Sequence, residues 1–322
     1  MTLATAAGPL MGNHDALWLD LDGVVYRSHD PVPHAVKSIS AVHTQGTAVA
    51  FLTNNASRPP ATISAHLREL GLEFVSDEDV VTSAQAIAQV MGRELPSGAR
   101  VLVVGGEGLR QALSVQGLVP VASLHDKPQA LVQGFAPDLG WADLAEASYA
   151  IAAGLPWFVS NTDLTVPTAR GTAPGNGALV HAVKTATGAE PTVGGKPFAP
   201  LFDTTRERLG SANPLMVGDR IDTDIVGARR SGIASLHVLT GVDDVNVLAD
   251  LAEANRPDFV APDLRALSQP HRKVLVDGDE AACGQARATR LGGVIGATGG
   301  TELDRVRAAV ELSWHGGGRI EL

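Results

Sequence analysis

Cysteine, long apolar stretches and positive charge are all scarce in this sequence, and each shortage excludes a class of protein. Cys283 is the one cysteine among 322 residues, so an internal disulfide framework or a zinc site built from several cysteines is excluded. No stretch approaches about 18 apolar residues, and the start of the chain lacks the basic residues and apolar core of a signal peptide. We therefore expect no membrane partner and a cytoplasmic location.

The shortage of positive charge bears on the choice of partner. The formal net charge is −10, and lysine and arginine form no run or stripe along the chain. A nucleic-acid partner is not expected, because nothing in the sequence would neutralise a row of phosphates. An acidic protein that binds phosphate has to gather positive charge locally, from a metal ion or from a few well-placed side chains.

What the sequence does contain is an alternation of apolar runs and helix-like segments. The runs at 16–21, 47–53, 214–219 and 235–240 are typical of buried strands, and the segments at 33–44, 59–70 and 223–231 have helical spacing. This alternation predicts the α/β class, with a parallel sheet covered by helices on both faces.

Domain organisation follows from the places where this alternation changes. Residues 82–191 have strands and helices of their own, and we expect them to form an inserted α/β domain. The core would then consist of 12–81 and 192–267. Residues 268–322 have glycine-rich turns and a helix expected from Glu302 to about Trp314, and they form an appendage whose role the sequence leaves open.

Paired carboxylates mark the end of the first predicted strand. Asp20 and Asp22 stand in the run Asp-Leu-Asp-Gly, at the carboxyl end of the strand, where open parallel sheets bind ligands. Two carboxylates at a buried strand end repel each other unless a cation lies between them, and Mg²⁺ prefers such oxygen ligands. Taken alone, the pair is equally compatible with two solvated side chains at a turn.

Two further segments suit a phosphate. Thr53 and Asn54 end the second strand, and a hydroxyl followed by backbone N–H groups can bind phosphate oxygens. Lys196 stands in the run Gly-Gly-Lys-Pro and is one of five lysines, so its charge is held on a defined backbone. Taken singly, the first segment would be a helix cap and the second a solvated surface turn.

A third group of carboxylates follows a later strand. Asp219 could supply a further metal oxygen, and Asp222 and Asp224 come in the first turn of the next helix. Asp224 could cap that helix, or hold Lys196 or a metal-bound water, whereas Asp222 is typical of acids at helix N-termini. The four segments together, in the order acid pair, Thr-Asn, Lys and acid pair, favour a phosphate site with a metal ion.

The segments DLDGVVY, FLTNNASR, GGKP and MVGDRIDTDIVGAR resemble the four ordered motifs of the haloacid dehalogenase (HAD) superfamily. The insert resembles the C2-type cap of the NagD-like (type IIA) branch, and its stretch SNTDLTVPTARGTAPGNGALVHAVKTATG is similar to the passage from cap to core in that branch. Over about residues 14–265 the chain is most similar to the actinobacterial glycerol 3-phosphate phosphatases. Ser28 and His34 depart from the family, which often has glycine there.

The resemblance implies a Rossmann-like HAD core with an α/β C2-type cap, and a hydrolase that works through an aspartyl-phosphate. It implies that Asp20 is the nucleophile and that Asp22 is the general acid and base. It also implies that Mg²⁺ is bound by Asp20, the backbone carbonyl of Asp22 and Asp219, with Asp224 in support of the metal's water shell or of Lys196.

The same resemblance implies that Thr53 and the Asn54 backbone bind phosphate oxygens, while Lys196 neutralises the phosphoryl group and Asp20. The cap would close over the site and contact the leaving group. Substrate contacts are expected from a further group in the cap, namely Asn161, Gly175 and Asn176. Asp163 is interpreted instead as fixing the cap against the core.

The expected reaction is hydrolysis of a small phosphorylated metabolite, with glycerol 3-phosphate as the preferred substrate. Phosphoglycolate, a sugar phosphate, a nucleoside monophosphate and p-nitrophenyl phosphate stay open, because the core motifs do not contact the leaving group. A phospho-acceptor signalling module would lack Asp22 and the large insert, and a scaffold on an inactive phosphatase would not keep every catalytic position. The helix at 302–314 is expected to pack within the chain, with a homodimer contact as the alternative.

Overall fold

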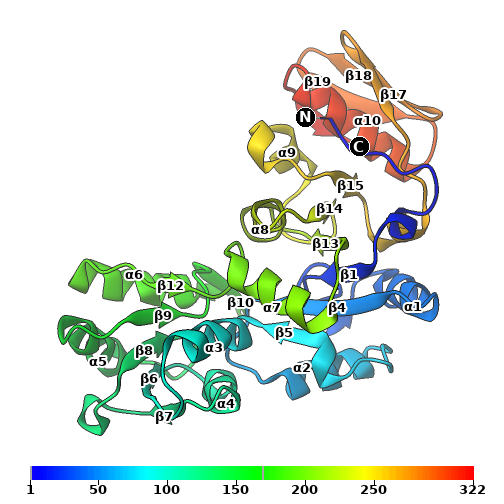
Figure 1. Cartoon of the computed structure of the whole chain (residues 1–322). Coiled ribbons are helices and arrows are strands. Elements are labelled where there is room, and N and C mark those ends of the chain that lie inside the picture. The colour runs from blue at the N-terminus through cyan, green and yellow to red at the C-terminus, as the bar shows by residue number, and fades with distance from the viewer. Residues whose placement is uncertain (1, 169) are drawn as a thin grey trace. The chain divides into compact units, whose positions relative to one another are not determined.

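The computed structural model describes residues 2–168 and 170–322, and it contains two compact units (Figure 1). Unit 1 consists of the residues up to Ala50, of Leu70–Leu72 and of Leu209–Leu322. Unit 2 consists of Phe51–Glu69 and Glu73–Arg208.

A six-stranded sheet in the order β15-β14-β13-β1-β4-β5 contains the strands that the apolar runs predicted. Parallel registers join β1 to β13, β13 to β14, β14 to β15 and β4 to β5. Every residue of β1 and β13 is buried, as expected for strands covered on both faces. The bounds are β1 Ala16–Leu19, β4 Ala48–Thr53, β5 Val80–Thr82, β13 Pro214–Gly218, β14 Ala234–Val238 and β15 Phe259–Ala261.

Unit 1 also contains a small hairpin that follows β1 and leads to the first helix. It is formed by β2 (Tyr26–Arg27) and β3 (Asp30–Pro31), and α1 begins at Ala35. Ser28 and His34 have φ of 56° and 70°, in the left-handed region that side chains rarely adopt. This explains physically why glycine suits these two positions in the family.

The helices of unit 1 differ in length and in what they contribute. They are α1 (Ala35–Thr44), α8 (Val226–Arg230), α9 (Val245–Ala249) and α10 (Glu302–Trp314). A π-helical turn, Ile221–Ile225, runs into α8 and carries Asp222 and Asp224. Turns of this kind are frequent at functional sites.

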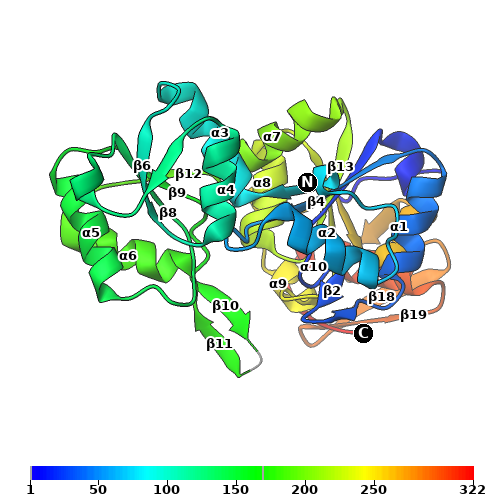
Figure 2. The ribbon, with the colours of Figure 1, turned by 90° about the horizontal axis from the view of Figure 1, so that it is seen from below.

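Unit 2 contains a second parallel sheet, in the order β12-β9-β8-β6-β7 (Figure 2). Its strands are β6 (Arg100–Val104), β7 (Val119–Val121), β8 (Ala130–Gln133), β9 (Trp157–Val159) and β12 (Thr192–Val193). The antiparallel hairpin of β10 (Thr165–Thr168) and β11 (Gly171–Pro174) extends from this part of the unit. The helices are α2 (Pro60–Glu69), α3 (Ser83–Glu94), α4 (Glu107–Val115), α5 (Trp141–Ala152), α6 (Asn176–Thr187) and α7 (Ala199–Leu209).

The C-terminal part of unit 1 is a folded sheet-and-helix layer, which the sequence did not predict. Its sheet has the order β16-β17-β18-β19-β20, antiparallel except for the last pair. The strands are β16 (Val274–Asp277), β17 (Glu280–Cys283), β18 (Ala286–Leu291), β19 (Val294–Thr298) and β20 (Arg319–Glu321). The predicted helix is confirmed as α10, Glu302–Trp314, and its apolar residues share one buried cluster with this sheet.

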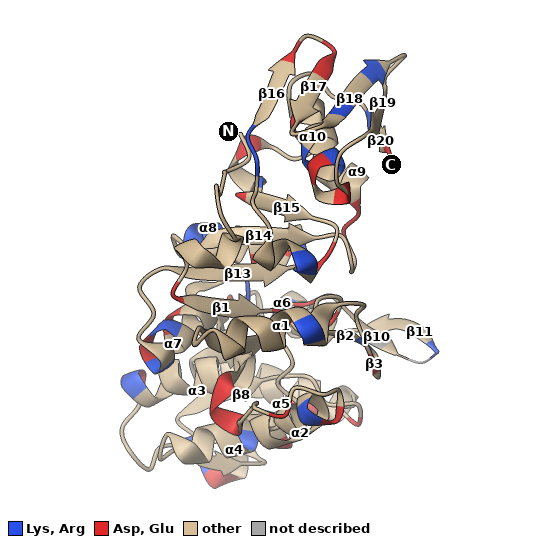
Figure 3. Ribbon diagram, turned by 90° about the vertical axis from the view of Figure 1, so that its right-hand side faces the viewer, with Lys and Arg blue, Asp and Glu red and all other residues tan. Residues whose placement is uncertain are grey.

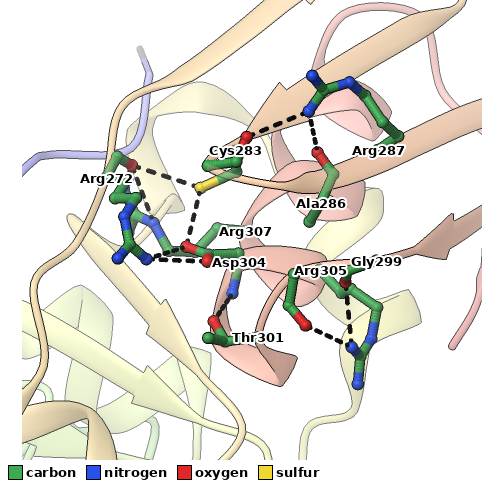
Figure 4. A network of polar contacts seen from close by, with 11 residues as sticks. Arg272, Cys283, Ala286, Arg287, Gly299, Thr301, Asp304, Arg305 and Arg307 are labelled. Atoms are coloured by element: carbon green, nitrogen blue, oxygen red, sulfur yellow. Dashed lines mark hydrogen bonds and ion pairs between the residues drawn. The ribbon is translucent and has the colours of Figure 1, made fainter.

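A network of buried polar groups lies between α10 and this sheet (Figure 4). Asp304 is 2% exposed, and it accepts hydrogen bonds from Arg272 at 2.9 Å and from the Cys283 thiol at 3.5 Å. Burial raises the pKa of Cys283 to about 11, so the thiol stays protonated at neutral pH. Arg307, fully buried, donates to the carbonyls of Ala4 at 2.8 Å and Arg272 at 2.9 Å.

The same helix holds the segment at residues 3–6. Glu311, also buried, accepts the Leu3 N–H at 2.7 Å. Ala6 forms an antiparallel bridge with His271, whose ring lies 3.2 Å from the Arg307 guanidinium. Buried charges such as these are costly unless they are paired and hydrogen-bonded, so this segment is part of what stabilises α10.

The α/β class is confirmed, and the two parallel sheets with their helices fit the Rossmann-like core and α/β cap that the resemblance implies. The predicted boundaries, 12–81 with 192–267, 82–191 and 268–322, stay a prediction. Lys and Arg are spread over several elements, including α7, α8 and β18 (Figure 3). In the part of the chain that the structure describes, no helix is both long and apolar enough to cross a bilayer.

Candidate active site

Three carboxylates converge in unit 1. Asp20, Asp219 and Asp224 each offer an oxygen, and these oxygens all lie within 4.8 Å of one another. We call these three carboxylates the acid cluster. Asp219 and Asp224 are fully buried and Asp20 is partly buried. Three negative charges this close repel one another strongly unless a cation is present. The all-oxygen donor set suits a hard divalent ion such as Mg²⁺.

The parallel pairing of β1 and β13 brings Asp20 and Asp219 together. Leu19 lies opposite Val217, and the Asp20 N–H donates to the Val217 carbonyl at 2.9 Å. Asp20 and Asp219 therefore come directly after two neighbouring strands, at their carboxyl ends. This confirms the interpretation of the two apolar runs as strands of one parallel sheet that end in acid, and the structure adds that the two strands are neighbours.

Glycines allow the carboxylates to come this close. A Cβ at Gly218 would lie 2.2 Å from the Asp224 Cβ, and a Cβ at Gly23 would lie 2.4 Å from Asp219 Oδ2. Gly23 also has φ of +83°, which glycine adopts without strain. The glycine of the run Asp-Leu-Asp-Gly is therefore needed for space as well as for conformation.

Asp224 lies closer to the other two carboxylates than the sequence prediction placed it. The sequence assigned it a supporting role, and the structure brings its carboxylate into the group with Asp20 and Asp219. Its Oδ2 accepts the Arg220 N–H at 3.2 Å. Asp222 differs, because its side chain is 67% exposed and pairs with Arg220 at 2.8 Å, as expected for an acid at the start of a helix.

Asp22 lies beside this group rather than in it. Its side chain is exposed, and the chain turns sharply after it, with the Gly23 N–H donating to the Tyr26 carbonyl at 2.8 Å. Among the described residues, the carboxylate of Asp22 does not belong to the three that converge. An exposed carboxylate two residues after Asp20 suits exchange of protons with solvent.

The predicted phosphate-binding residues form a second group, within unit 2. Thr53 ends β4, and its hydroxyl accepts the Asn55 N–H at 3.0 Å. The Asn54 amide holds the backbone of Lys196 at both ends: it accepts the Lys196 N–H at 2.8 Å and donates to the Lys196 carbonyl at 3.1 Å. Lys196 is 2% exposed, and its Nζ lies 3.4 Å from the Leu52 carbonyl. The structure thus confirms that the Lys196 backbone is held in place.

The predicted cap residues surround Asn54. Asn161 donates to the Asn54 carbonyl at 2.7 Å, and Asp163 accepts from the Asn54 amide at 3.0 Å. Asn176 in turn donates to the Asn161 carbonyl at 2.7 Å, and a Cβ at Gly175 would lie 2.4 Å from the Asp163 carbonyl. These contacts support the fixing role given to Asp163. A contact with substrate by the other three stays a prediction.

A segment that contacts the acid cluster was not predicted from the sequence. Residues 241–243, after β14, contact Asp219 mainly through backbone N–H groups. Backbone donors have no side-chain signature. The only available signal was the position of the segment, directly after a buried strand of the same sheet.

Comparison with known proteins assigns the family. A model described as haloacid dehalogenase-like hydrolase matches residues 17–119, and a HAD-hydrolase-like model matches 193–267. The chain belongs to the haloacid dehalogenase-like hydrolases. It is 45% identical over 263 residues to the D-glycerol 3-phosphate phosphatase of Mycobacterium tuberculosis, covering 82% of this chain and 73% of that protein.

One further relative and one solved structure bear on the site and on the C-terminal layer. The acid sugar phosphatase of Staphylococcus saprophyticus is 35% identical over 236 residues, 72% of this chain and 89% of that protein. The crystal structure of the M. tuberculosis glycerol phosphate phosphatase in complex with magnesium matches with a TM-score of 0.84 and 41% identity, over 97% of this chain and 94% of that one. Because that match leaves only 3% of this HAD hydrolase uncovered, most of residues 268–322 have a counterpart in it.

Proposed function

We propose that this HAD hydrolase is a Mg²⁺-dependent phosphatase for small phosphate monoesters, with glycerol 3-phosphate as its substrate. One observation carries the proposal. The oxygens of Asp20, Asp219 and Asp224 converge within 4.8 Å in a chain that is 45% identical to a D-glycerol 3-phosphate phosphatase. Asp22, expected from the sequence as the general acid and base, follows Asp20 by two residues in the same unit.

The two chemical steps are assigned to Asp20 and Asp22. An oxygen of Asp20 bonds to phosphorus while the bond from phosphorus to the alkoxide oxygen breaks, and Asp22 gives its proton to that oxygen. Asp22 then takes a proton from water, whose oxygen bonds to phosphorus and releases inorganic phosphate and Asp20. The exposure of Asp22 supports this role, because its carboxyl group is accessible both to a leaving group and to the water that enters in the second step.

Mg²⁺ is the cofactor, and the residues that fit it are Asp20, Asp219, Asp224 and the predicted carbonyl of Asp22. When bound, it offsets negative charge on the phosphoryl group and on the nucleophile. Binding by Asp224 itself, rather than through a water, is part of the proposal.

Thr53, the Asn54 backbone and Lys196 are proposed to bind the phosphate oxygens. The backbone of the buried Lys196 is held at its N–H and its carbonyl by the Asn54 side chain, and its Nζ lies 3.4 Å from the Leu52 carbonyl, next to Thr53. Strands β1 and β4 are neighbours in the sheet order, which supports a shared role for their carboxyl ends.

The nucleophile is tested by Asp20→Asn, with Asp222→Asn as the matched control. Asp20→Asn should lower kcat on any phosphate ester by at least about 1,000-fold, because an amide does not replace the carboxylate as a nucleophile. Asp222→Asn should leave kcat unchanged, since that carboxylate pairs with Arg220 at the surface. Activity of the Asp20 variant within a few-fold of wild type would refute the assignment.

The substrate is tested by comparing kcat/KM over a panel of esters. Glycerol 3-phosphate should give a higher kcat/KM than sugar phosphates, phosphoglycolate, nucleoside monophosphates and p-nitrophenyl phosphate. The second candidate is a sugar phosphate, which the 35% identity to an acid sugar phosphatase favours. A sugar phosphate that exceeds glycerol 3-phosphate by tenfold would replace it as the substrate and leave the chemical steps as proposed.

A cytoplasmic location, the absence of a nucleic-acid partner and the alternative of a homodimer stay predictions from the sequence. Cell fractionation, a filter-binding assay with DNA and RNA, and light scattering of the purified chain test them in turn.

A further inference from the structure

The segment after β14 lies against Asp219. The Val242 N–H donates to Asp219 Oδ2 at 2.7 Å, and the Asp243 N–H donates to the Asp219 carbonyl at 3.1 Å. The contact has no spare room, because a Cβ at Gly241 would lie 1.8 Å from the same Oδ2. The direction of the Asp219 carboxylate therefore depends on the place of this segment.

The Asp243 side chain reaches the other side of the acid cluster. Its Oδ2 accepts the Ile221 N–H at 2.7 Å. Ile221 is the first residue of the π-helical turn that carries Asp224. With its own N–H and its carboxylate, Asp243 thus holds both ends of the short stretch from Asp219 to Ile221, and the carboxylate bond is of the stronger, charge-assisted kind.

Asp243 is itself held by a buried histidine. His237, the fourth residue of β14, is fully buried, and its Nε2 lies 3.1 Å from the Asp243 carbonyl, to which it donates. Burial lowers the pKa of His237, so the ring is neutral and Nε2 carries the proton. The register of β13 and β14 places His237 opposite Gly218, directly before Asp219. A rigid strand residue therefore fixes the place of Asp243.

We propose that Asp243 is a positioning residue for the metal site: it holds Asp219 and the turn that bears Asp224 in the arrangement that binds Mg²⁺. This rests on the metal site of the proposed function. Groups that orient metal ligands in this way typically contribute 10- to 100-fold to metal affinity.

Asp244 is a matched control for Asp243. It is the next residue and also an aspartate whose carboxylate accepts two backbone N–H groups, from Asn246 at 2.8 Å and Val247 at 3.1 Å. These groups belong to α9, and neither belongs to the stretch from Asp219 to Ile221. Asp244→Ala therefore removes comparable hydrogen bonds from a carboxylate to the backbone, none of which involves the acid cluster.

The experiment measures the Kd for Mg²⁺ by isothermal titration calorimetry on the full chain, beside kcat at rising Mg²⁺ and the Tm. Asp243→Ala should raise the Kd at least about tenfold, with kcat recovering to within a few-fold at saturating Mg²⁺. Asp243→Asn should stay within about threefold of wild type, because its amide oxygen can still accept the Ile221 N–H. Asp244→Ala should leave the Kd unchanged.

The outcomes separate this proposal from the one on which it rests. A Kd for Asp243→Ala equal to wild type, with a Tm lowered as in Asp244→Ala, would reduce Asp243 to a structural residue. If Asp243→Ala does not fold, Asp243→Glu replaces it: the longer side chain should weaken Mg²⁺ binding relative to Asp243→Asn, and equal affinities would overturn the proposal. A wild-type chain that binds no Mg²⁺, or an Asp219→Asn variant that binds it normally, would refute the metal site itself.

Discussion

Gly23→Ala tests the two reasons why glycine is needed at this position: its positive φ and the lack of room for a Cβ beside Asp219. Gly23 has φ of +83°, so alanine there costs ~1–2 kcal/mol of backbone strain. Its Cβ would also lie 2.4 Å from Asp219 Oδ2, where ordinary contact begins at 3.4 Å. Asp219 or the backbone of Gly23 would have to give way by about 1 Å. A displacement of this size at a catalytic group can lower the rate ~100-fold.

Gly46→Ala is the control, because Gly46 has the positive φ but has room for a Cβ. Gly46 has φ of +85°, nearly that of Gly23, and a Cβ there would meet nothing within 4 Å. Both variants should lose the ~1–2 kcal/mol of backbone strain in thermal unfolding, and Gly23→Ala should lose more because of its clash with Asp219. Only Gly23→Ala should lose kcat/KM by ~100-fold and bind Mg²⁺ more weakly by calorimetry. If the two variants keep the same activity and Mg²⁺ affinity, the carboxylate of Asp219 is not held by steric contact, and the reasoning fails.

Three further outcomes are expected. Arg307→Ala should lower the free energy of unfolding by ~3–5 kcal/mol, because it leaves buried carbonyls unpaired. Arg305→Ala, at a partly exposed position of the same helix whose bond to the Gly299 carbonyl is exposed, should cost less than ~1 kcal/mol, and equal losses in urea unfolding would contradict this. Burial, and after it the charge of Arg307, lowers the pKa of His271 to about 4. The unfolded chain therefore binds the extra proton between about pH 6.5 and 4, so stability is full above this window and falls by up to ~3 kcal/mol as the pH decreases through it. His271→Gln should remove that slope, and an unchanged slope would show that another group causes it. Asp22→Asn should slow glycerol 3-phosphate far more than p-nitrophenyl phosphate, whose leaving group needs no proton; equal effects on kcat would refute the acid role.

The sequence predicted the acid cluster because its parts are side chains at the ends of apolar runs. Asp20 and Asp219 follow buried strands that pair in parallel, and topology alone then brings them together. The direct place of Asp224 could not be predicted, because it depends on a π-helical turn that shifts the residues after Arg220 by part of a turn. Nor could the role of Val242, which acts through its backbone N–H.

The C-terminal sheet was missed for a different reason. Its strands are short and contain Ala, Thr and Arg where a stronger apolar alternation would have been recognised, as in Ala286–Leu291. One of the glycine-rich turns expected from the sequence, at Gly292, is a tight connection of this sheet. Gly278, Gly284 and Gly292 all have positive φ and stand between successive strands. Glycines with positive φ therefore lie at the hairpin turns, while the strands between them have no clear apolar alternation.

The segment at residues 3–6 has a consequence for how the protein is made on the ribosome. Leu3 is synthesised 308 residues before Glu311, the side chain that accepts its N–H. Domains generally fold in order as they emerge. The bond from Leu3 to Glu311 can therefore form only after α10 has left the exit tunnel, when both large sheets have already been translated. Completion of the C-terminal layer is thus a late event of synthesis, and it uses a residue made 308 positions before its partner.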